Sequence, residues 1–170
     1  MPSTDRPTER TFFDAGLFIA ALCEADARHK EALPLVEAAR EGAIAACTTA
    51  SVLNEVYAVL TWEKTMPRLD PAEAARVVGL LIFSRSAIEV LDCGHETARK
   101  ALELAAAHNL TARRVHDARH AAAAILHSVD SVYTYDTSDW RVFETDGLKI
   151  TGPPSVLSRI EALSEDSGSS

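Results

Sequence analysis

Short apolar runs alternate with longer amphipathic segments along almost the whole chain. Thr11, Phe12 and Phe13 form the first apolar run, and a segment with helical spacing follows directly. The pattern predicts further strands at 43–47, 87–91, 131–135 and 147–152, and helices at 15–25, 29–40, 48–62, 70–84, 95–108 and 111–128. Residues 136–140 are expected to form a turn. Strands that alternate with helices are typical of an α/β domain with a mainly parallel sheet.

The length and hydrophobicity of the chain favour a single domain. Its 170 residues, 47% of them hydrophobic, can bury one ordinary core. We expect the domain to span 11–154, with polar tails at 1–10 and 155–170, the second largely disordered at its end. Because no apolar run approaches the roughly 18 to 20 residues that cross a bilayer, and the first ten residues are polar, we expect a cytoplasmic protein without a membrane segment.

The charge and the cysteines exclude some classes of site. A formal charge of −8 argues against a protein that holds nucleic acid through a broad basic surface. It is compatible with a nuclease, because carboxylates that bind a divalent cation contribute negative charge and the cation reverses the local field. Cys23, Cys47 and Cys93 are odd in number and lack a zinc-binding spacing, so we expect buried free thiols.

Several acidic residues stand in places that require an explanation. Asp14 interrupts the apolar window TFFDAGLFIA, where an unpaired carboxylate is costly to bury, so it is a helix cap, a paired group or a metal ligand. Glu55 lies beside the apolar stripe of its helix, where a rim position also explains it. Asp117 suits the first turn of a helix on electrostatic grounds. Asp136 and Asp139 are equally compatible with a turn. Local context alone leaves each of these alternatives open.

Four segments together resemble the PIN-domain family, and in particular the VapC-type toxin ribonucleases. They are FFDAGLFIAAL, SVLNEVYAVL, HDARHAAAAIL and VYTYDTSDWRVF, and the last is the most specific. The resemblance implies a three-layer α/β/α sandwich with a mainly parallel central sheet. It also implies a metal-dependent endoribonuclease that uses Mg²⁺ or Mn²⁺ to hydrolyse RNA phosphodiester bonds. As a toxin of this type, the protein would pair with a small antitoxin and form a homodimer.

The resemblance also assigns roles by position. Its four catalytic acids fall on Asp14, Glu55, Asp117 and Asp136, with Asp14, Asp117 and Asp136 as metal ligands and Thr134 and Asp139 as supporting residues. Glu55 would orient water or complete the metal shell. The chain departs from the family after Asp14, where Ala and Gly replace the hydroxyl and polar residues found in many members.

The densest positive charge lies beside Asp117. Arg113, Arg114 and Arg119 could contact RNA phosphates there, although a solvated helix start is an equal explanation.

Two other functions remain open. His116, His120 and His127 lie within about 40° on an ideal helix, which suits a zinc hydrolase, although a polar helix face explains the spacing. The alternative from another class is a catalytically weak PIN-like RNA-binding or interaction protein. Nucleotide-cofactor enzymes rank below both, because the sequence has neither a GxGxxG nor a P-loop pattern.

Overall fold

A five-stranded parallel sheet forms the centre of the molecule. The computed structural model describes residues 9–155. The strands follow the order β3-β2-β1-β4-β5, and every neighbouring pair is parallel. They comprise β1 (Thr11–Phe13), β2 (Ala46–Thr49), β3 (Glu89–Leu91), β4 (Ser131–Tyr133) and β5 (Lys149–Thr151). The predicted α/β class with a parallel sheet is confirmed.

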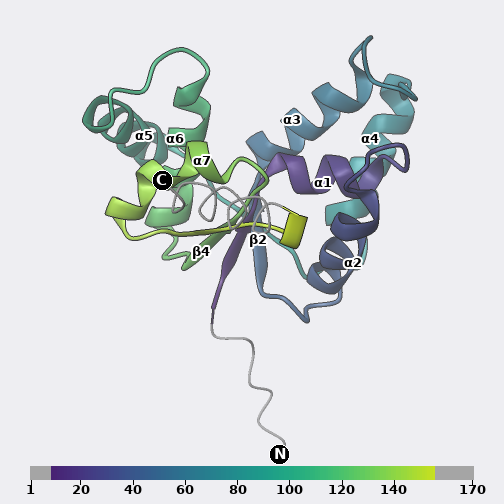
Figure 1. Ribbon diagram of the computed structural model, residues 1–170, viewed down its shortest axis with the longest axis horizontal. Helices are drawn as coiled ribbons and strands as arrows, with labels where there is room; N and C mark the ends of the chain where they lie inside the picture. Colours follow the sequence, from purple (N-terminus) through teal and green to yellow (C-terminus); the bar gives the residue numbers. More distant parts are fainter. Residues whose placement is uncertain (1–8, 156–170) are drawn as a thin grey trace, which may run out of the picture.

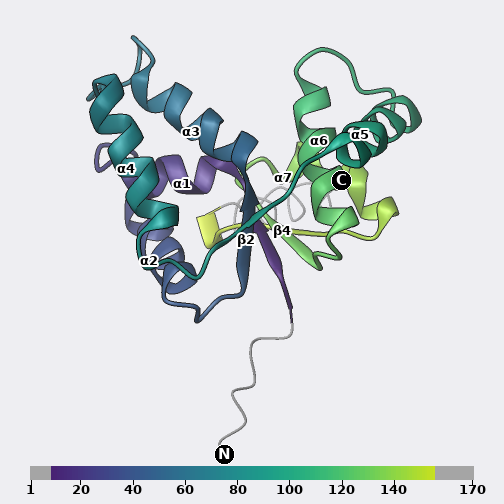
Figure 2. The ribbon, with the colours of Figure 1, turned by 180° about the vertical axis from the view of Figure 1, so that it is seen from behind.

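Helices cover both faces of this sheet. They are α1 (Ala15–Leu22), α2 (His29–Arg40), α3 (Ala50–Thr61), α4 (Pro71–Phe83), α5 (His95–Ala107), α6 (Arg114–Leu126), α7 (Thr137–Trp140) and the 3-10 helix η1 (Arg141–Asp146). Helices α1 to α4 lie on one side, and α5, α6 and α7 lie on the other (Figures 1 and 2). This is the expected three-layer α/β/α sandwich.

The alternation of side chains along β1 divides the core between the two faces. Successive residues of a strand point to opposite sides. The ring of Phe12 lies 6.0 Å from that of Trp140 in α7, whereas the ring of Phe13 lies 6.1 Å from that of Phe18 in α1. Trp140 also contacts Phe143, with ring centroids 5.7 Å apart. Each face of the central strand therefore anchors a different helical layer.

The chain reverses its winding direction at β1. From β1 it proceeds through α1 and α2 to β2, and then through α3 and α4 to β3, with these four helices on one face. It then crosses through α5 and α6 on the other face to β4, the strand on the opposite side of β1. Such a topological switch opens a crevice outside the carboxyl ends of the two central strands. Asp14 follows β1 directly, and Thr134 follows β4 directly, so both stand at this crevice.

The structure differs most clearly from the predicted elements in two places. The strand expected at 43–47 is found at Ala46–Thr49, because Thr48 and Thr49 pair with β3 before the next helix begins. The turn expected at 136–140 is mostly the short helix α7, continued by η1. Its buried residues Trp140 and Phe143 recur at helical spacing, which fixes this conformation. Gly147, with φ +94°, then ends η1 in the left-handed region that glycine adopts readily.

The expectation of buried free thiols is confirmed in full for one cysteine of the three. All three are free, and Cys47 is buried, with burial raising its pKa to about 12. Cys23 is partly exposed, and Cys93 is exposed because it lies in the loop between β3 and α5.

Other features of the described part bear on the expectations for the chain ends and surface. The tails expected to be polar lie almost entirely outside the described residues. No helix within 9–155 is long and apolar enough to cross a membrane.

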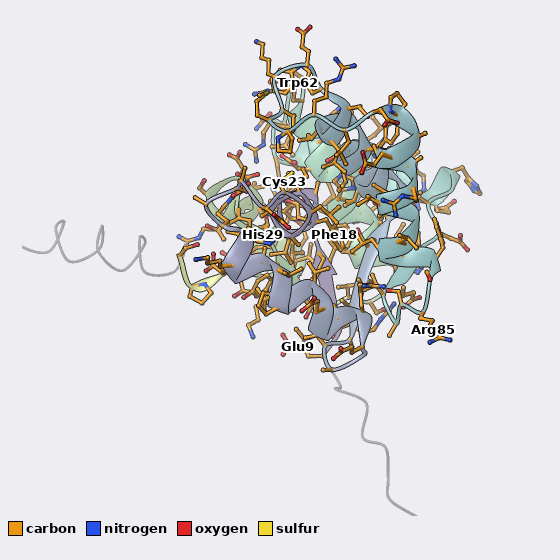
Figure 3. All side chains as sticks on the ribbon, turned by 90° about the vertical axis from the view of Figure 1, so that its right-hand side faces the viewer. Glu9, Phe18, Cys23, His29, Trp62 and Arg85 are labelled. Atoms are coloured by element: carbon orange, nitrogen blue, oxygen red, sulfur yellow. The ribbon has the colours of Figure 1, made fainter. Side chains whose placement is uncertain are left out.

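Trp62 is 53% exposed and stands at the opposite end of the molecule from Glu9 and Arg85 (Figure 3).

Candidate active site

The buried carboxylate of Asp14 is the centre of the candidate site. Its backbone is extended (φ −81°, ψ 162°), so its side chain continues the alternation of β1 and is expected on the Phe12 side, which faces α6. Its Oδ1 accepts a hydrogen bond from the Ala15 amide at 2.8 Å, and its Oδ2 accepts one from the Thr134 hydroxyl at 2.8 Å. Burial nevertheless raises the pKa of Asp14 above its ordinary value. The site therefore holds this carboxylate in place without fully compensating its charge.

Thr134 connects the ends of the two central strands. It is fully buried, and its hydroxyl donates to Asp14 while accepting from the Asp136 amide at 3.0 Å. Asp136 is exposed and lies at the N-terminus of α7. The pKa of Arg28 is raised chiefly by its hydrogen bond to Asp26, and the negative charge of Asp136 contributes to the same shift. The backbone amide of Asp136 is thus connected to Asp14 through Thr134, whereas the Asp136 carboxylate lies at the rim of the site.

Asp117 approaches from α6 on the other side of the crevice. It stands in the first turn of that helix, and its side chain is 29% exposed. Burial is the main cause that raises its pKa, and the charge of Asp14 raises it further. The Arg114 guanidinium opposes this shift through a hydrogen bond of 3.1 Å to Asp117 Oδ2. Arg114 also binds the backbone oxygen of Asp139 at 2.5 Å and lies 3.5 Å from its carboxylate.

Glu55 approaches from α3 and has basic partners. Its Oε1 lies 2.8 Å from His120 Nε2 and 3.8 Å from an Arg119 nitrogen. Burial raises the pKa of Glu55, but the hydrogen bond and charge of His120, together with Arg119 and His116, outweigh burial, so the pKa lies below its ordinary value. Glu55 also adds to the raised pKa of Asp14, which shows that the two charges interact.

A charged cleft runs between α3 and α6 beside these acids. Its volume is about 510 Å³. The lining residues are mainly polar or charged: Ser51, Asn54, Glu55, Ala58, Arg113, His116, Asp117 and Arg119. Two of the three arginines predicted to contact RNA therefore line it, whereas Arg114 is engaged with Asp117 and Asp139. A cleft with both carboxylates and arginines can take an anionic ligand that also interacts with a cation.

The carboxylates fit a hard divalent cation by their chemistry. Mg²⁺ and Mn²⁺ prefer oxygen ligands. A cation would offset the cost of burial that mainly raises the pKa of both Asp14 and Asp117, and would also relieve the repulsion from neighbouring acids that adds to each shift. Within residues 9–155, however, no three His, Cys, Asp or Glu side chains are arranged to hold a metal ion together. The bond from Arg114 to Asp117 occupies one oxygen of that carboxylate.

His116 and His120 of α6 and His127, its C-cap, do not share one exposed face. His116 lines the charged cleft, whereas His120 is 2% exposed and lies among the buried alanines of the helix. His127 binds the backbone oxygen of Asp92 at 2.8 Å. The interpretation of these histidines as a polar helix face is therefore wrong for His120. The signal that could have identified it was its place at the start of an alanine-rich, apolar stretch of the helix.

Comparison with known proteins agrees with this architecture. The family model described as PIN domain matches residues 11–143. No curated protein matches the sequence. The fold is similar to that of VapC20 from Mycobacterium tuberculosis, a sarcin–ricin loop cleaving toxin, with a TM-score of 0.60 and 21% identity over 76% of this chain and 92% of that chain.

Two solved complexes are also similar in fold. One is VapBC2 from Rickettsia felis bound to a promoter DNA fragment, with a TM-score of 0.59 and 14% identity over 85% of this chain and 98% of that chain. The other is FitAcB from Neisseria gonorrhoeae, with a TM-score of 0.57 and 13% identity over 82% of this chain and 95% of that chain. The sheet topology, the acids at its switch point and a family match over most of the length agree: the chain belongs to the PIN domain family.

Proposed function

We propose that this protein is a metal-dependent endoribonuclease and the toxin of a VapBC-type toxin–antitoxin pair. The observation that carries the proposal is Asp14: a carboxylate only 9% exposed, fixed by two hydrogen bonds at the switch point of a parallel sheet. Glu55 and Asp117 lie within electrostatic range of it. A buried carboxylate beside further acids is stabilised either by a bound cation or by protonation. A cation bound there can take part in the hydrolysis of a phosphodiester.

The acids have different proposed roles in binding Mg²⁺ or Mn²⁺. Asp14 and Asp117 would hold the ion directly, and Asp136 would do so directly or through water. When bound, the ion supplies an activated water and stabilises the charge on the phosphoryl and leaving oxygens. Thr134 fixes the Asp14 carboxylate through its hydroxyl, so one oxygen of the acid keeps its position.

The remaining residues bind and orient. Glu55, with a lowered pKa, is an ionised hydrogen-bond acceptor that can orient the attacking water. Arg113 and Arg119 line the cleft and can hold RNA phosphates on either side of the scissile bond. Arg114 and Asp139 form an ion pair that limits the movement of Asp117.

A small antitoxin and a second copy of the chain are the proposed partners. Support comes from the kind of neighbour found: the similar folds include a toxin–antitoxin complex from Klebsiella pneumoniae and a member of the VapBC family of toxin–antitoxin systems. Expression of the chain alone should slow bacterial growth, and co-expression of a small protein encoded beside it should relieve the arrest. Growth arrest that persists equally in Asp14→Asn would contradict a catalytic toxin.

The decisive experiment measures RNA cleavage by the purified protein with Mg²⁺, with Mn²⁺ and with EDTA. We expect metal-dependent cleavage that Asp14→Asn and Asp117→Asn each abolish. The loss should exceed the roughly 10- to 100-fold that removal of an outer supporting group costs, because these residues are proposed to hold the ion itself. Metal binding, measured by calorimetry, should weaken in the same variants.

Asp92→Asn is the matched control, since it removes an exposed carboxylate outside the acidic group. It should cleave RNA at the wild-type rate. Folded wild-type protein that binds RNA but cleaves none with either metal would favour the alternative of an RNA-binding PIN domain. That alternative has one observation in its favour, the absence of a ready-made metal cage among residues 9–155.

A further inference from the structure

His120 is a buried polar group in an otherwise apolar helix face. It is 2% exposed, and its ring lies 6.0 Å from that of Phe12 in the central strand. Every other buried residue of α6 is an alanine. A buried imidazole without partners would cost free energy, so its two ring nitrogens require hydrogen bonds. Neither its helix nor the core supplies a reason for a histidine at this position.

Both partners of His120 belong to α3 or to its N-terminal cap. Nε2 lies 2.8 Å from Oε1 of Glu55, and Nδ1 lies 3.3 Å from the hydroxyl of Thr49. Thr49 is the N-cap of α3, where its hydroxyl accepts from the Val52 amide at 3.3 Å. One side chain of α6 therefore spans from the start of α3 to the acidic residue in its second turn.

Hydrogen-bond chemistry fixes the direction of the bond between His120 and Glu55 in either charge state of the ring, and that of the bond to Thr49 when the ring is neutral. An ionised carboxylate has only acceptors, so Nε2 of His120 must carry a proton and donate to Glu55. In the neutral ring Nδ1 then accepts, and the Thr49 hydroxyl can donate to it while accepting from the Val52 amide. The tautomer of the neutral ring is thus set by the Glu55 carboxylate, and the rotation of the ring by Glu55 and Thr49 together.

The contact also leaves one oxygen of Glu55 free for the cleft. His120 and Arg119 both approach Oε1. Across the described part of the chain no hydrogen bond to Oε2 is found, and Glu55 lines the charged cleft. On α6, His120 comes three residues after Asp117, so the two side chains are neighbours on the helix surface. The position of His120 therefore helps to determine the distance between Glu55 on α3 and Asp117 on α6.

We infer that His120 is a positioning residue: it holds the Glu55 carboxylate with Oε1 engaged and Oε2 toward the cleft, at a fixed spacing from Asp117. This inference rests on the proposed ribonuclease function and deepens it. His120 does not touch the substrate in this role. His120 affects cleavage only by holding Glu55 in place. A comparison of variants at the two positions can therefore test this role.

Two isosteric substitutions separate the two nitrogens of the ring. The amide nitrogen of glutamine reaches about the place of Nε2, and that of asparagine about the place of Nδ1. His120→Gln therefore keeps a donor for Glu55, whereas His120→Asn loses it. We expect His120→Asn to lower kcat for RNA cleavage by about 10- to 100-fold with little change in KM, and His120→Gln to restore most of the loss.

A double-mutant cycle with Glu55→Gln tests the route of the effect. If His120 acts through Glu55, His120→Asn should cause no further loss of kcat once Glu55→Gln is present. The same cycle is measured for Mn²⁺ affinity by calorimetry, a readout that does not require turnover. Additive losses, or equal behaviour of His120→Asn and His120→Gln, would show that the histidine only fills space.

The outcomes for the two proposals are distinguishable. Wild-type protein that cleaves no RNA contradicts the ribonuclease, and the Mn²⁺ cycle still tests the coupling. Active wild-type protein with additive losses contradicts the role of His120 alone. If circular dichroism shows that His120→Asn is unfolded, Thr49→Val replaces it. That variant removes the hydroxyl partner of Nδ1 and should give a smaller kcat loss that likewise disappears in the Glu55→Gln background.

Discussion

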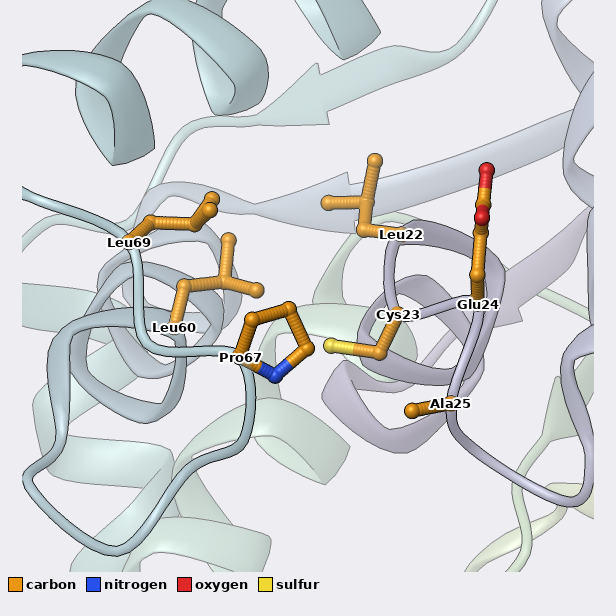
Figure 4. Close-up of a pocket in the computed structure, with 7 residues that line it drawn as sticks. All are labelled: Leu22, Cys23, Glu24, Ala25, Leu60, Pro67 and Leu69. Carbon is orange, nitrogen blue, oxygen red and sulfur yellow. The ribbon is translucent and has the colours of Figure 1, made fainter.

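Two hollows of nearly equal volume lie beside α3, and they differ in almost every other property. The charged cleft, about 510 Å³, lies between α3 and α6. The apolar hollow, about 500 Å³, lies between the end of α1 and the α3–α4 connection, where the sulfur of Cys23 points toward Pro67 (Figure 4). Its lining residues are Leu22, Cys23, Glu24, Ala25, Leu60, Pro67 and Leu69.

Helix α3 contributes to the two hollows from different faces. Ser51, Glu55 and Ala58 follow the three- and four-residue spacing along the charged cleft, whereas Leu60 is turned by about 200° from Ala58. One face of α3 thus presents a carboxylate held by a buried histidine, and the other a leucine that is 1% exposed. The size of a hollow therefore says little about its use. The charged side chains that line a hollow, in spite of the cost of burying charge, are a better indication of its function.

The largest expected effect on stability belongs to the apolar hollow. Leu60→Ala should lower the free energy of unfolding by about 2–5 kcal/mol, because it removes buried methyl groups beside space that already exists. RNA cleavage per folded molecule should remain at the wild-type rate. Chemical denaturation measures the first quantity and a cleavage assay the second.

The matched substitution on the other face of α3 is Asn54→Ala, at an exposed residue of the charged cleft. It should change stability by less than about 0.5 kcal/mol. Equal destabilisation by Leu60→Ala and Asn54→Ala would remove the distinction between a packing face and a chemical face.

A smaller effect is expected for RNA affinity at the charged cleft. Arg113→Gln removes an exposed guanidinium that can neutralise a phosphate. The slope of log affinity against log salt should then decrease by about 0.7, the value for one phosphate contact on a single strand. Fluorescence anisotropy of labelled single-stranded RNA in EDTA measures this slope without cleavage. Arg85→Gln, an exposed arginine outside this cleft, should leave the slope unchanged.

The sequence predicted the fold well because its pattern is local. Strand β1 needs only the apolar run before Asp14, and α4 begins at Asp70 and Pro71, whose cap and fixed φ are visible in the sequence. The turn at 136–140 was predicted wrongly, because the helix there depends on burial of Trp140 and Phe143 against other elements. Such packing is a tertiary effect that no short window contains.

The candidate site could be predicted only in part. Asp14 was conspicuous because a charge interrupts an apolar window. The contacts of His120 with Thr49 and Glu55 join residues 71 and 65 positions apart, so only the folded chain brings them together. The ion pair from Arg114 to Asp139 has the same origin, since its partners are 25 positions apart. The roles given to the four acids stay predictions until the variants are measured.

The smallest expected effect concerns the stability of the metal-free protein. Burial and the charge of Asp14 raise the pKa of Asp117, so the folded state holds this proton to higher pH than the unfolded state does. Ionised Asp117 therefore lowers stability increasingly as the pH rises above 3.8, its ordinary value, and through the folded pKa. Asp117→Asn removes that charge but keeps an oxygen that can accept from Arg114 Nε.

In EDTA, the Tm of Asp117→Asn should consequently exceed that of wild type at pH 7 by a few degrees, and the difference should shrink as the pH falls toward 3.8. Added Mn²⁺ should raise the Tm of wild type more than that of the variant, because binding to the folded state stabilises it. A carboxylate that destabilises the metal-free folded state at neutral pH and is stabilised by a cation contributes to ligand binding. Leu60, in contrast, contributes to the stability of the fold. Loss of stability in Asp117→Asn at pH 7 in EDTA would place Asp117 with Leu60, as a residue whose main contribution is structural.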